Sequence, residues 1–483
     1  MPIAAASLVS PPLFTAADIR TVEQRGAERH PGRSLMAAAG EVAADFAAQI
    51  ALDTGAPVLV LAGPGNNGGD ALVAARHLAA RGYRVVAVSR ADPARLPPDA
   101  AAARAAWQDD GGTLLPDLPA GQAYSLVIDG LFGVGLTRAV EGPDAGWIAA
   151  VNALPCPRLA LDLPSGLDGD TGCILGCAVR ADHTLSFIGL KPGLLTADGP
   201  DVAGSVWLDP LGVEPDLLPA VAGSALTRLE PRHRLPPRRQ NSHKGDFGRV
   251  GIVGAAPGLV GAGLLAGRAA LLQGAGSVTL AALDDRLVVD SGEPRLMLAA
   301  PEQLVAQPLD ALAIGPGLGQ SPRAAALLDA ALAAPCPLVL DADALNLLAA
   351  DPGRMPRLAA RTASTLMTPH PGEAARLLGS TPSAIQARRI DAARRLATLT
   401  GAHVALKGAG TVIAHPDGHY AVNTSGGPWL AQAGSGDRLT GMALALLAQG
   451  LPAGDALEAA CWLHGSAQAA SPLTSRPHPD SPI

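Results

Sequence analysis

Aromatic side chains and cysteine are scarce in this sequence of 483 residues. Aromatic residues make up only 3% of it, which argues against rows of rings that stack nucleic-acid bases. The five cysteines are an odd and dispersed set in which only Cys173 and Cys177 lie close together, so a disulfide framework is not expected. Together with a stretch Met1–Phe14 that lacks the basic start of a signal peptide, this predicts buried thiols and a cytoplasmic protein.

Charge is also sparse, and neither sign dominates strongly. Charged residues are 16% of the chain and the net charge is −7, which argues against general binding to nucleic acid or to a membrane surface. The uncharged run Val250–Gly267 contains Pro257 and several glycines, so we interpret it as a strand, a loop and a helix rather than a membrane span. With 48% hydrophobic residues, the chain has enough apolar material for two or three packed domains.

The first half contains a glycine-rich loop between a predicted strand and a predicted helix. The strand is Pro57–Ala62, the loop Gly63–Asp70 and the helix Ala71–Arg81. Such a loop lies at the carboxyl end of its strand, where open α/β sheets bind ligands. The glycine spacing matches G-x-G-x-x-G, but two asparagines and an aspartate crowd the place where a pyrophosphate would sit. These side chains indicate a loop that binds a cation or a polar ligand, with a simple tight turn as the alternative.

Two further predicted strands of this half end in carboxylates. Asp129 follows one of them, and Asp162 follows the next, with Ser165 three residues later. Because parallel strands end at the same edge of a sheet, we expect these side chains and Asn67 to converge on one crevice. Lys191, which follows a further strand, is expected either to contact a ligand phosphate or to be solvated.

Together these motifs resemble the NAD(P)H-hydrate epimerase family. The resemblance rests on Gly65–Asp70, Asp129–Gly135, Asp162–Gly166 and Lys191–Gly193, and it covers about Ala16–Leu211. It implies a Rossmann-like three-layer fold that interconverts the R and S forms of reduced nicotinamide cofactors hydrated at C6. It also implies a potassium ion held by Asn67, Asp129 and Ser165, and Asp162 as the catalytic acid or base beside the damaged ring. The residues implied to bind the hydrated cofactor are Asn66, Asn67, Gly68, Gly69, Asp70, Gly133, Val134, Gly135, Leu136, Thr137, Arg138, Ala139 and Asp162.

A proline-rich segment, Leu211–Arg239, separates the two halves. We interpret it as a linker whose basic cluster, Arg232–Arg239, is solvated. Beyond it strands and helices alternate again, and every predicted strand runs into a glycine, polar or prolyl loop, which predicts a second parallel α/β domain. We place the two domains at residues 1–222 and 223–483, with a disordered tail at 471–483.

A helix of the second half opens with small residues and a carboxylate, Gly434–Asp437. Free backbone N–H groups at such a helix start can hold a phosphate. A carboxylate repels phosphate, but it can deprotonate a hydroxyl beside one, which favours Asp437 as a base. The alternative is an acidic residue that only complements the helix dipole.

Three other loops of this half carry candidate ligand contacts. Lys407–Thr411 offers a cation, backbone amides and a hydroxyl to the phosphates of a nucleotide, and it is not a Walker loop. His370, which stands between two prolines, is expected to contact ligand rather than only to cap its loop. Asp343 and Asn346 follow another strand and are as well suited to brace a loop as to touch a substrate.

The second half resembles the ribokinase-like superfamily, and more closely the ADP-dependent NAD(P)H-hydrate dehydratases, over about Ser242–Gln468. The motifs are Lys244–Gly248, Gly315–Gly319, Asp341–Asn346, Thr368–Glu373, Lys407–Thr411 and Gly434–Asp437. The resemblance implies that Lys407, Gly408, Ala409, Gly410, Thr411 and Gly436 bind ADP or ATP, and that Gly317, His370 and Asp437 bind the hydrated cofactor. It also implies a mechanism: the nucleotide phosphorylates the C6 hydroxyl with Mg²⁺ present, Asp437 takes the proton, and the ring nitrogen expels phosphate. Arg438 departs from the family, which has valine there, and Gly427 replaces a usual asparagine.

The two resemblances meet in one pathway, so we predict a bifunctional repair enzyme. The dehydratase accepts the S form, and an epimerase on the same chain lets one protein repair both epimers. We expect small-molecule substrates only, with no nucleic acid and no membrane, and a homo-oligomer. The alternatives are a kinase of a vitamin-precursor alcohol in the second half, a non-catalytic binding module in the first half, like a domain of an mRNA-decapping scaffold, and an ordinary NAD-dependent dehydrogenase. Intact Asn67, Asp129, Asp162 and Ser165 weigh against the binding module.

Overall fold

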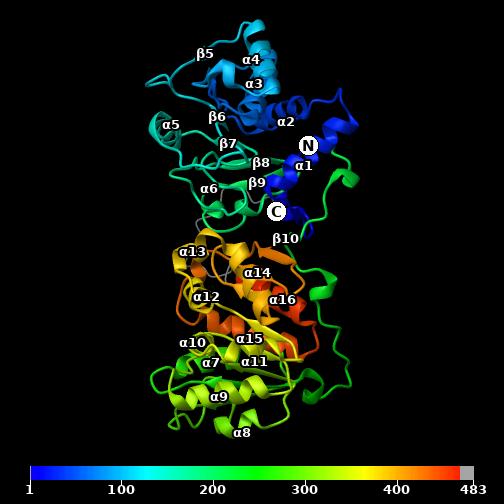
Figure 1. Ribbon diagram of the computed structural model, residues 1–483, viewed down its shortest axis with the longest axis vertical. Helices are drawn as coiled ribbons and strands as arrows, with labels where there is room; N and C mark the ends of the chain where they lie inside the picture. The colour runs from blue at the N-terminus through cyan, green and yellow to red at the C-terminus, as the bar shows by residue number, and fades with distance from the viewer. Residues whose placement is uncertain (1, 468–483) are drawn as a thin grey trace. The chain divides into compact units, whose positions relative to one another are not determined.

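The computed structural model describes residues 2–467 and divides the chain into two compact units, 1–225 and 226–483. The tail predicted at 471–483 lies outside the described residues. Within them, no helix combines the length and the apolar character needed to cross a bilayer. Both units are built on largely parallel sheets flanked by helices, as the alternating strand and helix pattern predicts (Figure 1).

The first unit contains an eight-stranded sheet with the order β1-β9-β8-β7-β6-β3-β4-β5. All neighbours in it are parallel except β1 and β9. In the order of the sheet, the strands are β1 (Ile3–Ala4), β9 (Ser205–Asp209), β8 (His183–Phe187), β7 (Arg158–Leu161), β6 (Leu126–Gly130), β3 (Val58–Ala62), β4 (Val85–Val88) and β5 (Leu114–Leu115). β2 (Pro12–Leu13) pairs antiparallel with β10 (Gly223–Leu226).

Alternate residues of the central strands enter two different cores, which makes this unit a three-layer sandwich. Val58 and Val60 of β3 pack with α2 (Leu35–Ile50), α3 (Asn66–Ala80) and α4 (Pro98–Asp109). Leu59 and Leu61 pack with α5 (Gly142–Asn152) on the opposite face. The remaining helices are α1 (Ala16–Arg29) and α6 (Gly199–Val202). Burial on both faces explains why β3 is an uninterrupted apolar run.

The second unit has a parallel sheet that ends in an antiparallel hairpin. In spatial order its strands are β13 (Met297–Leu298), β12 (Ser277–Ala282), β11 (Arg249–Gly254), β14 (Ala311–Ile314), β15 (Leu338–Leu340), β16 (Thr365–Met367), β17 (His403–Leu406), β18 (Val412–Ala414) and β19 (Tyr420–Asn423). The sequence pattern predicts the parallel part but not the hairpin, whose two short strands follow the glycine loop that β17 enters. That loop is only a few residues long, and a connection of that length can join only antiparallel strands.

Helices α7 (Val260–Leu272), α15 (Ser435–Ala448) and α16 (Ala453–Ala467) form one core with the sheet of this unit. The other helices of the unit are α8 (Pro301–Val305), α9 (Pro322–Ala333), α10 (Asp343–Ala350), α11 (Arg354–Ala359), α12 (Pro371–Leu378), α13 (Pro382–Ala387) and α14 (Arg389–Thr400). The uncharged run that could be mistaken for a membrane span consists of β11, a loop and α7, as predicted from its glycines and proline.

One minor sequence prediction is incomplete and one is wrong. The arginines of the basic cluster after the linker are exposed, as predicted, but Arg232 and buried His233 also bind Glu458 of α16, at 2.7 Å each. Glu458 is itself buried, so it needs these partners. Cys173 and Cys177 are half-buried rather than buried, because they lie on a surface loop of the first unit.

Candidate functional site

The first site is built where the loops after β3 and β6 touch each other. A Cβ on Gly63 would lie 1.7 Å from Leu131 O, and a Cβ on Gly68 would lie 2.2 Å from Gly63 O. These glycines are therefore required for close backbone packing, which positions Asn67 at the start of α3 against the loop after β6. Gly133 of that loop lies against the Asn67 side chain, while Gly135 and Thr137–Ala139 are exposed and lie beyond it.

Three buried oxygen-bearing side chains, Asn67, Asp129 and Ser165, lie at this contact, and Asn67 holds the one oxygen among them that has no partner in the described part of the chain. Ser165 donates its Oγ–H to Asp129 Oδ1 at 2.6 Å and its backbone N–H to Asp129 Oδ2 at 2.8 Å. Asn67 Nδ2 donates to Phe132 O at 3.1 Å, and this leaves the buried Oδ1 of Asn67 without a partner among residues 2–467. Burial raises the pKa of Asp129 to about 6, against the bonds from Ser165 that lower it. Buried carboxylate, amide and hydroxyl oxygens of this kind suit a hard cation.

Asp162 and Lys191 form an ion pair at the same edge of the sheet. Lys191 is fully buried, and its Nζ donates to Asp162 Oδ1, to Ser186 Oγ at 3.2 Å and to Phe187 O at 2.9 Å. Asp162 has a left-handed backbone with φ 65°, which is costly for a residue with a Cβ and is typical of functional sites. Lys191 is therefore neither solvated nor free to meet a phosphate, and both expectations for it are wrong. An isolated buried ammonium is unstable, so the carboxylate is its necessary partner.

Two further carboxylates, Asp70 and Glu23, feel the charge of Asp162. Asp70 of α3 is half-buried, and its pKa is raised well above the ordinary range by burial and by the charges of Asp162 and Glu23. Glu23 comes from α1, and the sequence gives no motif that identifies it. Its placement depends on how α1 packs, which only the structure reveals.

The second site surrounds the first turn of α15. Lys407 Nζ lies 2.8 Å from Asp341 Oδ1, and Thr440 donates its hydroxyl to Asp341 Oδ2 at 2.8 Å. A Cβ on Gly436 would lie 3.1 Å from Lys407 Nζ, so glycine at this position keeps the ammonium beside the free N–H groups of the helix. The helix begins after Gly434, which has φ 83°. This arrangement forms an anion site from a helix start and a lysine.

Asp437 lies in the same turn, and no cation within residues 2–467 forms an ion pair with it. Burial raises its pKa to about 6, and Asp341 adds to this while Lys407 opposes it. Asp341 itself is buried, yet Lys407 and Thr440 more than offset the effect of burial and lower its pKa. Although the sequence shows Asp341 directly after a strand, as it does for Asp129 and Asp162, we did not assign it to the site. The strand-end position is the signal that could have identified it.

The other predicted contacts mainly brace loops. His370 Nδ1 accepts the backbone N–H groups of Gly372 and Glu373, at 2.9 and 3.2 Å, and its Nε2 faces Glu373 Oε1 at 3.2 Å. The histidine is thus a helix cap, and only the exposed half of its ring remains for a ligand. Asp343 accepts the N–H of Gly319 at 2.9 Å, which ties α10 to the loop that holds Gly317.

The nucleotide-loop glycine next to Lys407 also has a structural role. Gly408 has φ 143°, and a Cβ on it would lie 2.6 Å from Nη1 of Arg389, which is buried beneath the loop. The same guanidinium donates to Leu406 O at 3.2 Å and to Lys407 O at 3.4 Å. Arg389 therefore fixes the backbone of the loop Lys407–Thr411 from below.

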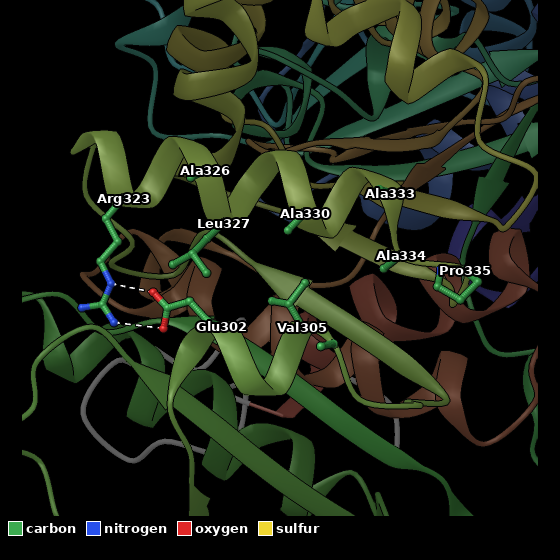
Figure 2. A pocket seen from close by; sticks show the side chains of 10 residues that line it. Glu302, Val305, Arg323, Ala326, Leu327, Ala330, Ala333, Ala334 and Pro335 are labelled. Carbon is green, nitrogen blue, oxygen red and sulfur yellow. Dashed lines mark hydrogen bonds and ion pairs between the residues drawn. The ribbon is translucent and has the colours of Figure 1, made fainter.

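Neither site coincides with the groove in Figure 2, which lies between α8 and α9 and has a volume of about 500 Å³. Half of its lining residues are alanines, and the exposed pair Glu302–Arg323 lies at one end. It contains no nucleophile, base or anion-binding loop, so we assign no chemistry to it.

The two units match two different protein families. The family model described as NAD(P)H-hydrate dehydratase matches residues 250–477, and the one described as YjeF-related protein N-terminus matches residues 32–193. The bifunctional NAD(P)H-hydrate repair enzyme Nnr of Escherichia coli is 39% identical over 430 residues, which are 85% of this chain and 79% of that protein. The enzyme of the same name from Moorella thermoacetica is 37% identical and covers 94% of this chain and 91% of that protein.

Solved structures resemble single units of this chain. The ADP/ATP-dependent NAD(P)H-hydrate dehydratase of Bacillus subtilis, co-crystallised with ATP and Mg²⁺, is 32% identical, with a TM-score of 0.44. The aligned region spans 49% of this chain and 86% of the Bacillus subtilis chain.

Proposed function

Because this chain belongs to the bifunctional NAD(P)H-hydrate repair enzymes, we propose that its two sites divide the repair between them. The protein is an epimerase and a dehydratase of hydrated NADH or NADPH. We assign epimerisation to the site of Asp162 and dehydration to the site of Asp437. The observation that carries this assignment is a carboxylate of raised pKa beside a helix start and a lysine, because that combination suits phosphorylation of a hydroxyl.

In the dehydratase site, each step has a residue of this chain to support it. Lys407 and the backbone N–H groups at Gly436 hold the phosphoryl group as it leaves ADP or ATP, which binds as its Mg²⁺ complex. Asp437 takes the proton of the C6 hydroxyl as the new O–P bond forms. The lone pair of the ring nitrogen then breaks the C6–O bond and expels phosphate, and loss of the C5 proton restores the C5=C6 double bond. Asp341 keeps Lys407 in place, because its two oxygens accept from Lys407 and from Thr440.

In the epimerase site, Asp162 is the acid or base beside C6. The neighbouring residues Asn66–Asp70 and the loop Gly133–Ala139 would bind the rest of the hydrated cofactor. Asn67, Asp129 and Ser165 would hold potassium, an assignment supported by the unpartnered Asn67 Oδ1 and the buried Asp129. When bound, potassium would supply a positive charge that orders the two strand-end loops.

The experiment that tests this function follows the absorbance of the intact reduced nicotinamide ring. The protein is mixed with R and S hydrates of NADPH, Mg²⁺, potassium and either ADP or ATP. We expect full recovery with the wild-type protein, recovery of the S form only with Asp162→Asn, and none with Asp437→Asn. Spontaneous exchange of R and S is measured without protein and must be slow. A stable phosphate ester in place of recovered cofactor would contradict the repair function and indicate a small-molecule kinase.

We also infer that the protein works in the cytoplasm and as a homo-oligomer. The absence of disulfides among the described cysteines fits a reducing compartment. Leu272 and Val288 of the second unit are 81% and 80% exposed, which suits burial against another subunit. Light scattering on the purified chain measures its assembly, and a monomeric mass would contradict this inference.

A further inference from the structure

In the epimerase site the fully buried lysine serves only one of three neighbouring carboxylates. Lys191 has three N–H groups, and they bind Asp162, Ser186 and the carbonyl of Phe187. None is left for Asp70 or Glu23, whose charges act on each other and on Asp162. Burial and mutual repulsion raise the pKa of both Asp70 and Glu23, which disfavours ionising all three carboxylates together. Asp162 is the member of the three that is bonded directly to a cation.

Asp70 is the carboxylate least able to carry a charge. It is the fifth residue of α3, beyond the first turn whose free N–H groups would stabilise an anion. Its carboxylate has no hydrogen-bond partner among residues 2–467, and the charges that act on it from other elements are the carboxylates of Asp162, Glu23 and Asp99. Glu23, in contrast, has Arg20 nearby on its own helix. Asp70 is nevertheless not fully buried, so part of its side chain is open to solvent.

We propose that Asp70 is the general acid of the epimerase site and works opposite Asp162, the base. This inference deepens the proposed function of the first unit and rests on it. Two carboxylates in environments that favour opposite protonation states are the usual arrangement for paired acid and base catalysis. Burial and the neighbouring negative charges also raise the pKa of Asp70 well above that of a solvated aspartate.

The chemistry of the hydrate requires such a pair. Asp70 gives its proton to the C6 hydroxyl, the C6–O bond breaks, and water leaves while the lone pair of the ring nitrogen forms the N1=C6 double bond. Water then adds to the other face of C6, its proton goes to Asp162, and the electron pair returns to the nitrogen. A proton passes from Asp162 to Asp70 through water to restore the starting state. One water is released and one is consumed, so the net reaction is inversion at C6.

The test measures interconversion of R and S hydrates by the full chain without nucleotide, so that the dehydratase is idle. Asp70→Asn keeps the size and polarity of the side chain but cannot donate the proton. We expect kcat for epimerisation to fall by about 10²–10⁴-fold with KM unchanged. We expect Asp70→Glu to recover part of the rate. In the wild type, the rate falls at high pH as Asp70 ionises. This fall, the basic limb of the pH–rate profile, disappears in Asp70→Asn.

Asp99→Asn is the matched control, because Asp99 is an exposed neighbour of Asp70 outside the site. It removes the same charge, leaves kcat at neutral pH unchanged, and shifts the basic limb to lower pH by weakening the repulsion on Asp70. In every variant, dehydration of S hydrate with ADP tests whether the second unit is still active. Thermal unfolding of the first unit tests whether that unit is folded.

An unchanged kcat in folded Asp70→Asn, or a rise in KM alone, would overturn the inference and leave Asp70 as a binding residue. If Asp70→Asn does not fold, Asp70→Glu becomes the deciding variant. Its glutamic acid can still donate a proton, so both epimerisation and the fall in rate at high pH should persist in it. A wild-type chain that dehydrates S hydrate but interconverts nothing would refute the proposed epimerase function itself.

Discussion

Each unit places a buried aspartate–lysine pair at the carboxyl edge of its sheet, but the pairs involve the reacting carboxylate differently. In the first unit Lys191 binds Asp162, the proposed catalytic residue itself. In the second unit Lys407 binds Asp341, and no cation within residues 2–467 forms an ion pair with Asp437. The lysine thus binds the first carboxylate directly, whereas burial raises the pKa of the second to about 6. This difference fits their proposed tasks, since Lys407 must remain available to phosphate.

The difference also shows why one unit needs a second acid and the other does not. A carboxylate locked in an ion pair can accept a proton only transiently, so the epimerase requires another group to donate. In the dehydratase the nucleotide activates the C6 oxygen as a leaving group, and phosphate leaves without a protein acid.

Removal of the lysines gives the largest expected effects. Lys191→Met leaves Asp162 buried beside no cation, and we expect the first unit to lose about 3–5 kcal/mol of its free energy of unfolding. Lys407→Met should cost less, because that side chain is partly exposed and Asp341 keeps its bond from Thr440. Urea unfolding followed by tryptophan fluorescence measures both, and tryptophans occur in each unit.

The double variants Lys191→Met/Asp162→Asn and Lys407→Met/Asp341→Asn are the controls for this prediction. Each removes the unpaired charge, so each should recover most of the stability without recovering activity. Equal losses in the two single lysine variants would contradict the comparison between the units.

The pH dependence of dehydration should follow Asp437. A base must be ionised, so kcat should fall as the pH drops through about 6, the value to which burial raises the pKa of Asp437. Lys407 opposes that rise, so Lys407→Met should move the limb to higher pH in whatever activity remains. The limb is absent in Asp437→Asn if Asp437 is its source.

The stability of the second unit should also depend on the ionisation of Asp437, but in the opposite direction: ionisation favours catalysis and disfavours folding. Because the pKa of Asp437 is raised in the folded chain, protonation favours folding: this contribution is fully present below about pH 4 and is lost as the pH rises through about 6. Asp437→Asn should therefore stabilise the second unit above neutrality by on the order of 1 kcal/mol, discounted for partial exposure. It should have no such effect in acid. An equal gain at both pH values would exclude this carboxylate as the cause.

Potassium should stabilise only the first unit. Asn67→Leu removes the unpartnered oxygen proposed to bind the ion, and the thermal shift that potassium produces, about 2–4 °C for a site worth about 1 kcal/mol, should vanish. Asn66→Leu changes the neighbouring exposed amide and should keep the response. Calorimetry in potassium and in choline chloride at equal ionic strength provides the measurement. If potassium stabilised Asn67→Leu as much as the wild type, the assignment of the ion to this site would be wrong.

Side chains at the ends of parallel strands could be predicted from the sequence, and pairings between distant segments could not. Asn67, Asp129 and Ser165 follow strands of one sheet, so the geometry of a parallel sheet brings them together without further information. The Asp162–Lys191 pair depends on how the loop after β8 turns back, where Ile188 has φ 67°. Thr440 meets Asp341 across 99 positions in the sequence, and that contact depends on helix packing. The same limit explains why the sequence did not reveal the partner of Arg232, because Glu458 lies 226 positions away.

Arg438 should have the smallest effect, because it lies at the margin of the second site. It is exposed in the first turn of α15, where a positive charge opposes the helix dipole. Its charge lowers the pKa of His464 and is not among the charges that shift the pKa of Asp437. Arg438→Gln should raise the stability of the second unit by about 0.3–1 kcal/mol and leave kcat unchanged. If the guanidinium also attracts the nucleotide's phosphates, the same change raises the nucleotide KM by about two- to fivefold at low salt, and high salt abolishes this increase. A fall in kcat would show instead that the first turn of α15 depends on this charge for catalysis, as it depends on Asp437.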